Sequence, residues 1–279
     1  MRGEFLDLSG ARLYYYAAGT RGAGMPVVFI HGFPTSSHLW ADVVPLMPSG
    51  HRLVVLDLLG YGRSDRPRDR PMDVRAHAER VVELLDELRI QKACLVGHGI
   101  GGGIAQSIAV RHAHRVSHLC LIDSVAFDRW PTTGARLARA TLPITRFLPP
   151  EVLSGVVRRR LERGYADPLR AVHSMDLYLR PFLSTEGRDA LVAHITALTT
   201  RETRKLGRQL KKISAPTAII WGDKDPVMPL DVGRALQASI ADATLQILPD
   251  RRHYTPEEAP RQIADAIADL LTRTSTRAF

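Results

Sequence analysis

A glycine-rich stretch in the middle of the chain has the residue types and spacing of two different functional sites. Residues 93–105, ACLVGHGIGGGIA, run from a short apolar segment into five glycines and then into a helical pattern. Gly97, Gly99 and Gly102 fit the G-x-G-x-x-G spacing of a dinucleotide-binding loop. Asp123 ends the next apolar segment, where such sites place an acid. The same stretch fits a nucleophile elbow, a sharp strand-to-helix turn in which small residues flank the reacting side chain, here at position 99.

Four further stretches favour the elbow. They are FIHGFP at 29–34, LDLLGYGRSDRP at 56–67, WGDKDPVMP at 221–229 and LPDRRHYTPEEAP at 248–260. A dinucleotide site leaves all four unexplained, and it is expected on the first strand of its sheet rather than after earlier apolar runs. In this order and spacing the five stretches together resemble the α/β-hydrolase family, and the resemblance covers nearly the whole chain.

The resemblance implies roles for residues at the ends of predicted strands. Position 99 corresponds to the nucleophile, Asp225 to the acid and His253 to the base. Asp123 is a second candidate for the acid, because some members of the family place the acid at the end of that strand. An Asp before a proline also forms turns, and a loop His often lies at the surface, but the motifs around both residues favour the functional interpretation.

The resemblance also implies an oxyanion hole formed by the backbone N–H groups of Phe33 and Ile100. The chain departs from the family at the reacting position, because Gly99 offers neither oxygen nor sulfur. A side chain at this turn is held in a strained conformation that costs about 1–3 kcal/mol, and glycine escapes the strain. Two forms of enzyme are consistent with this: a variant inactivated at position 99, whose native residue was Asp or Ser, or a natural member in which His253 and Asp225 act without a covalent intermediate.

The motifs are most similar to the branch of the family that uses an Asp nucleophile, the epoxide hydrolases and haloalkane dehalogenases. The His-Gly-Phe-Pro loop and the GHxIGGGIAQ frame carry this similarity. Tyr165 and Tyr178 are candidate substrate contacts, since epoxide hydrolases hold the epoxide oxygen with tyrosines of the cap. Dehalogenases tend to carry a Trp directly after the nucleophile to bind halide, and this chain has Ile100 there.

Two other functions stay open. A catalytically silent member of the family would bind a small ligand under its cap, and only activity separates it from an enzyme. An NAD(P)-dependent oxidoreductase, which the glycine spacing alone would imply, would be recognised by cofactor binding. The α/β-hydrolase interpretation implies a small-molecule substrate of the epoxide, alkyl halide or ester class and no cofactor. No metal is expected, because His112 and His114 stand two positions apart at a helix end, which puts their rings on different faces.

The elements that must position these residues alternate along the chain. Short apolar runs predict strands, and amphipathic periodicity predicts helices between them, notably at 73–89 and 100–113. This repetition is typical of an α/β fold, here with a mostly parallel sheet of eight strands flanked by helices. The strands are expected at 4–8, 12–17, 26–30, 52–57, 93–97, 118–123, 217–222 and 244–249.

One region breaks the alternation. Residues 127–212 show no strand pattern, only helix-like segments separated by prolines. This region is too long for a structureless loop. We therefore expect a helical cap at 127–212, inserted between core segments 1–126 and 213–279.

Composition indicates a globular protein without signals for export. The net charge of the 279 residues is +9, but 33 of the 38 basic residues are Arg spread over the whole length, so the chain lacks the basic stripe of a nucleic-acid-binding protein. No window approaches the ~20 apolar residues of a membrane span. Cys94 and Cys120 lie in predicted buried strands, as packed thiols of a reducing compartment do. We expect a cytoplasmic protein without nucleic-acid partner or membrane span; the sequence leaves its oligomeric state open.

Overall fold

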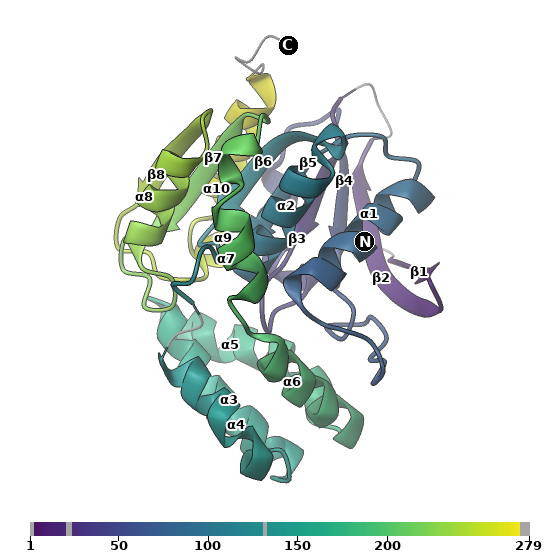
Figure 1. Ribbon diagram of the computed structural model, residues 1–279, viewed down its shortest axis with the longest axis vertical. Coiled ribbons are helices and arrows are strands. Elements are labelled where there is room, and N and C mark those ends of the chain that lie inside the picture. The colour runs from purple at the N-terminus through teal and green to yellow at the C-terminus, as the bar shows by residue number, and fades with distance from the viewer. Residues whose placement is uncertain (1–2, 21–23, 131–132, 274–279) are drawn as a thin grey trace.

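Eight strands form a single sheet in the computed structural model, which describes residues 3–20, 24–130 and 133–273 (Figure 1). All eight predicted strands are present, and their ends agree with the prediction to within two residues. The strands are β1 (Glu4–Leu8), β2 (Ala11–Gly19), β3 (Val27–Ile30), β4 (Arg52–Leu56), β5 (Ala93–His98), β6 (Val116–Ile122), β7 (Thr217–Gly222) and β8 (Ala243–Leu248).

The strand order is β1-β2-β4-β3-β5-β6-β7-β8. Strand β2 is antiparallel to both of its neighbours, and the strands from β4 to β8 pair in parallel. The glycine-rich stretch therefore follows a central strand, β5, and not the first strand of the sheet. The carboxyl ends of the parallel strands meet at one edge, which is where ligands bind in open α/β sheets. The prediction of an α/β-hydrolase fold with a mostly parallel eight-stranded sheet is confirmed.

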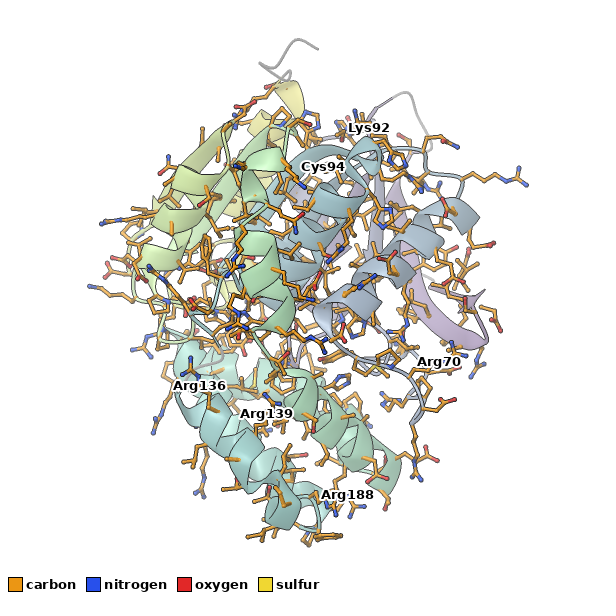
Figure 2. All side chains as sticks on the ribbon, viewed as in Figure 1. Arg70, Lys92, Cys94, Arg136, Arg139 and Arg188 are labelled. Carbon is orange, nitrogen blue, oxygen red and sulfur yellow. The ribbon has the colours of Figure 1, made fainter. Side chains whose placement is uncertain are left out.

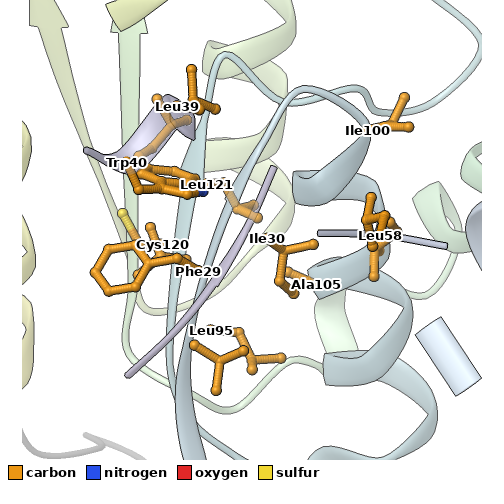
Figure 3. Close-up of a cluster of buried hydrophobic side chains, with 14 of the residues drawn as sticks. Phe29, Ile30, Leu39, Trp40, Leu58, Leu95, Ile100, Ala105, Cys120 and Leu121 are labelled. Carbon is orange, nitrogen blue, oxygen red and sulfur yellow. The ribbon is translucent and has the colours of Figure 1, made fainter. Parts of the chain in front are cut away.

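Helices of the core pack on this sheet. Helix α2 lies against β5 and β6 and also contacts α1, while α10 packs on β6 and β7. Figure 3 shows the apolar layer between α2 and the sheet, where Ala105 of α2 lies near Ile30 of β3. These helices are α1 (Val74–Glu87), α2 (Ile100–Arg111), α8 (Leu230–Ser239), α9 (Thr255–Glu258) and α10 (Pro260–Thr272).

Both cysteines lie inside this core. Cys94 and Cys120 are free thiols in the buried strands β5 and β6, as expected from the sequence. Burial raises the pKa of Cys120 to about 12, which keeps the thiol protonated and unreactive.

The region predicted to be a cap is helical throughout its described part; positions 131 and 132 lie outside the described residues. Helices α3 to α6 form a lobe beside the sheet (Figure 1). Pro150 and Pro168 stand at the first positions of α4 and α5, where the missing N–H costs no helical hydrogen bond. Helix α7 packs against α1 and α2 of the core. The helices are α3 (Thr133–Thr145), α4 (Pro150–Leu161), α5 (Pro168–Leu179), α6 (Thr185–Ala197) and α7 (Arg201–Gly207).

A buried histidine joins the cap lobe to the core. The ring of His194, on α6, stacks on Tyr61 with 3.8 Å between centroids. Its Nε2 lies 3.2 Å from the carbonyl oxygen of Gly60, so Nε2–H donates and the imidazole is neutral. Burial lowers the pKa of His194 to about 3, with Arg66 and His31 acting in the same direction.

We expect this histidine to make the folded protein less stable in acid. The folded His194 stays neutral down to about pH 3, whereas the unfolded side chain takes up a proton below about pH 6.5. The unfolded state thus binds more protons as the pH falls, and this one group should remove about 2 kcal/mol of unfolding free energy between pH 7 and pH 5. Denaturant unfolding of His194→Gln should show a shallower pH dependence over this range. His114→Gln, at an exposed position, should keep the steep dependence, and equal slopes in both variants would contradict the assignment.

Candidate active site

Gly99 forms a sharp turn between β5 and α2. Its backbone has φ 56° and ψ −120°, in the region that side chains rarely adopt. The Gly99 N–H donates to the carbonyl oxygen of Ile122 on the neighbouring strand at 3.1 Å, and its carbonyl oxygen accepts from Val125 N–H at 3.0 Å. These bonds hold the turn in place at the carboxyl edge of the sheet, as the elbow interpretation predicts.

The glycines of this stretch have different steric requirements. A Cβ on Gly97 would lie 2.4 Å from the carbonyl oxygen of Gly101, and one on Gly101 would lie 2.2 Å from that of Ile30. Both glycines therefore serve the close approach of α2 to the sheet, and not a pyrophosphate. A Cβ on Gly99 would meet only Cα of Gly32 at 3.7 Å and Nε2 of His253 at 3.8 Å, which are ordinary contacts. Position 99 has room for a side chain that points at the imidazole.

His253 and Asp225 form a buried pair. Nδ1 of His253 lies 2.8 Å from Oδ2 of Asp225, so Nδ1–H donates to the carboxylate and the lone pair of Nε2 faces position 99. Oδ1 of Asp225 accepts from the backbone N–H groups of Val227 (2.7 Å) and Met228 (2.9 Å). Asp225 thus forms the turn that its place before a proline suggests and also orients the imidazole.

The second candidate acid, Asp123, belongs to a different network. Its Oδ1 accepts from the backbone N–H of Gly222 at 2.9 Å, and its Oδ2 accepts from the Thr255 hydroxyl at 2.5 Å. Burial raises the pKa of Asp123 well above its usual value, and the nearby Asp225 raises it further. The geometry therefore favours Asp225 as the partner of His253 and gives Asp123 a role in joining β7 to α9.

The two backbone N–H groups proposed for the oxyanion hole lie beside the elbow. Ile100 is the first residue of α2, where a helix leaves its N–H groups without intrahelical partners. Phe33 follows β3 and lines the same cavity as Gly99 and Ile100. Within the described residues, neither N–H donates to another backbone group. The assignment of these two N–H groups to an oxyanion hole stays a prediction.

A cavity of about 160 Å³ lies between the elbow and the cap. An apolar cavity of about 150 Å³ holds a benzene molecule, so this space suits a small ligand. Its walls are mainly apolar, with Val156, Val157 and Leu161 from α4 and Ile195 from α6.

Among the cavity-lining residues that sequence reasoning missed, two carry side chains with N–H donors. Arg160 of α4 lines the cavity and adds a positive charge to a wall that also contains the imidazole of His253. Trp130 also lines it, but its indole N–H donates to the Thr203 hydroxyl at 2.7 Å. No signal in the sequence marks either residue, because the cap helices that orient them are placed by long-range packing.

The expectation that Tyr165 and Tyr178 contact substrate is wrong for this structure. Both hydroxyls donate to Oε1 of Glu257, at 3.1 Å from Tyr165, and Ser174 donates to Oε2. All four side chains are buried, and none belongs to the cavity wall described above. The tyrosines fail as substrate contacts because a buried carboxylate on α9 engages their hydroxyls.

Two further histidines brace the site. Nε2 of His31 accepts from the backbone N–H of Leu58 at 2.9 Å, and Nδ1–H donates to the carbonyl oxygen of Gly32 at 2.8 Å, which supports the loop of Phe33. Nε2 of His98 lies 2.8 Å from the carbonyl oxygen of His253. Burial lowers the pKa of His98 and, less strongly, that of His31, so both rings are neutral braces. In residues 3–20, 24–130 and 133–273, no group of three His, Cys, Asp or Glu side chains is arranged to hold a metal ion.

The chain belongs to the α/β-hydrolase fold family, whose family model matches residues 25–260. It is 30% identical to an uncharacterized hydrolase, YugF, of Bacillus subtilis, over 95% of this chain and 96% of that protein. It is 28% identical to haloalkane dehalogenase 2 of Mycobacterium tuberculosis, over 95% of this chain and 93% of the relative. An α/β-hydrolase fold protein of Burkholderia ambifaria superposes with a TM-score of 0.88 at 27% identity, covering 95% and 97% of the two chains. The prediction of the family is confirmed.

The steric difference between two glycines predicts unequal effects of the same substitution. Gly99→Ala adds only backbone strain and should cost about 1–3 kcal/mol of unfolding free energy. Gly101→Ala forces a methyl group against the Ile30 carbonyl oxygen and should cost about 3 kcal/mol or more. Chemical denaturation of both variants measures the difference. A Gly99→Ala variant less stable than Gly101→Ala would show that position 99 is not open.

The hydrogen bonds to Glu257 predict that removal of the Tyr178 hydroxyl lowers the stability of the fold, whereas removal of the Tyr254 hydroxyl does not. Tyr178→Phe removes a hydrogen bond to a buried carboxylate and should lower the unfolding free energy by about 1.5–3 kcal/mol. Tyr254 is the matched control, since its buried hydroxyl has no hydrogen-bond partner in the described chain. Tyr254→Phe should be neutral or stabilising. Thermal unfolding measures the stability of both variants. An equal loss of stability in the two would contradict this prediction.

Proposed function

We propose that this protein hydrolyses a small carbonyl substrate of the ester or lactone class by general-base catalysis, without a covalent intermediate. The observation that supports it is the orientation of His253, whose Nε2 faces the open position at Gly99 while Asp225 holds the opposite side of the ring. In this proposal a water molecule takes the position of the missing nucleophile.

The proposed reaction has two proton transfers. Nε2 of His253 takes a proton from the water as its oxygen adds to the carbonyl carbon, and Asp225 stabilises the resulting imidazolium. The carbonyl oxygen becomes an oxyanion and accepts from the N–H groups of Phe33 and Ile100. The tetrahedral intermediate then expels the alkoxide, which takes the proton from His253. The products are a carboxylic acid and an alcohol, or a hydroxy acid from a lactone.

The other two substrate classes find less support in the cavity. Alkyl halides and epoxides are opened in this family through a carboxylate nucleophile, which Gly99 cannot supply. A halide also needs a donor, and the N–H of Trp130 is engaged by Thr203. An epoxide oxygen needs hydroxyl donors, and those of Tyr165 and Tyr178 are engaged by Glu257. The main-chain oxyanion donors do not depend on residue 99, and they suit a carbonyl.

The activity of the unaltered chain tests this proposal. Phenyl acetate and small lactones match the cavity in size, and we expect slow, saturable hydrolysis of at least one. His253→Ala should lower kcat/KM by about 100-fold or more, the usual contribution of a general base. His114→Ala, at an exposed position outside the site, should leave it unchanged.

Gly99→Ser separates the proposal from a silenced enzyme. If water replaces the nucleophile, the parent shows no burst of alcohol release, and Gly99→Ser gains one as an acyl-enzyme accumulates. If the parent shows no turnover and the Gly99→Ser variant hydrolyses the substrate, the protein is an inactivated hydrolase. A parent that binds phenyl acetate or its products tightly, with neither form reacting, is the silent ligand-binding member of the family. Either result would overturn the proposed mechanism.

A further inference from the structure

The first cap helix exposes apolar side chains on one face. Leu137 and Ile144 of α3 lie seven positions apart, on the same side of the helix, and Phe147 follows three positions later. Ile144 is 78% exposed and Phe147 is 71% exposed. Such large exposed side chains in a row indicate a surface that meets a partner rather than water.

The next helix also exposes apolar side chains. Helix α4 begins three residues after Phe147, and two of its valines, Val152 and Val156, are also exposed. We refer to these five residues, Leu137, Ile144, Phe147, Val152 and Val156, as the cap ridge.

The charge around the cap ridge is strongly one-sided. Residues 129–161 contain seven arginines and a single acidic residue, Glu151, whereas residues 162–200 contain four arginines and five acidic residues. Two of the seven, Arg129 and Arg158, form ion pairs with Asp231 and Asp176. The guanidinium of Arg146 lies 4.7 Å from the ring centroid of Phe147, so charge and apolar surface meet at one point. Figure 2 shows Arg136 and Arg139 along α3, where both line a groove that also contains Asp73 and Asp128.

This combination fits an anionic lipid surface. Apolar side chains of an interfacial helix enter the boundary of the acyl chains while arginines contact the phosphates. A second copy of the chain would bring two strongly basic surfaces together, which is unfavourable. We propose that the cap ridge docks on membranes that contain anionic lipids. None of the described helices has both the length and the apolar character to cross a bilayer.

Docking would also place the cavity close to the lipid. Val156 belongs to the cap ridge and to the cavity wall, and Val157, beside it, lines the same cavity. A lipophilic ester would then pass from the bilayer into the cavity along α4. This consequence for substrate supply rests on the proposed function, whereas the docking itself does not.

Vesicle sedimentation of the full chain tests the docking without any substrate. The probes are vesicles of phosphatidylcholine alone and of phosphatidylcholine with about 30 mol% phosphatidylglycerol. We expect at least tenfold stronger partition onto the anionic vesicles, reduced severalfold in about 0.5 M NaCl. The double variant Ile144→Ser, Phe147→Ser should lower this partition at least fivefold, and Arg146→Glu, Arg159→Glu should do the same.

A matched control distinguishes binding through the cap ridge from binding through any exposed apolar side chain. Leu169 and Val172 on α5 are exposed apolar residues in the charge-balanced half of the cap, so Leu169→Ser, Val172→Ser should bind as the parent does. Circular dichroism checks that all variants fold. Equal partition onto both vesicle types, or equal loss in the control, would overturn the proposal. A concentration-dependent dimer that Ile144→Ser, Phe147→Ser dissociates, without vesicle binding, would instead identify the cap ridge as an interface between copies.

Discussion

The close approach of α2 to the sheet is the constraint on which the site depends. Gly97 and Gly101 leave no space for a Cβ, because Gly97 of β5 lies against the Gly101 carbonyl oxygen of α2, and Gly101 lies against the Ile30 carbonyl oxygen of β3. This contact sets the start of α2 at the carboxyl edge of the sheet, and with it the N–H of Ile100 and the open position at Gly99. A helix even one methyl group farther away would separate the elbow from the loop of Phe33.

A second constraint couples the base to the cap. The backbone N–H of His253 donates to the carbonyl oxygen of Gly164 at 2.9 Å, and four residues later Glu257 accepts from two cap tyrosines. Since α9 follows His253 directly, both ends of this segment are bonded to the cap. Moving the cap away on this side would leave a carboxylate and two hydroxyls without partners, at a cost of about 1–3 kcal/mol for each group. The position of the imidazole is therefore tied to a closed cap.

The features of the structure that depend on local sequence pattern and on backbone geometry could be predicted from the sequence. Apolar runs identified the strands, and motif spacing placed Asp225 and His253, which the structure brings within hydrogen-bonding distance. The roles of the cap residues could not be predicted in the same way. A tyrosine in a helix has the same local pattern whether its hydroxyl faces a cavity or a carboxylate 92 positions away, as Tyr165 does. The cavity residues Arg160 and Trp130 depend likewise on how α4 and the loop before α3 pack.

The absence of a side chain at position 99 changes the energetics of the imidazole as well as its chemistry. Asp225 fixes Nδ1–H, so Nε2 is an acceptor, and in the described chain no protein group donates to it. An acceptor in a mainly apolar cavity is costly unless it is hydrogen-bonded. A Ser hydroxyl at position 99 would supply that bond at the expense of backbone strain of about 1–3 kcal/mol. With Gly99 the strain is absent, and in the proposed mechanism a water that donates to Nε2 would satisfy the acceptor instead. The hydrogen bond that stabilises the neutral imidazole would then also orient the water for proton transfer to His253, as general-base catalysis requires.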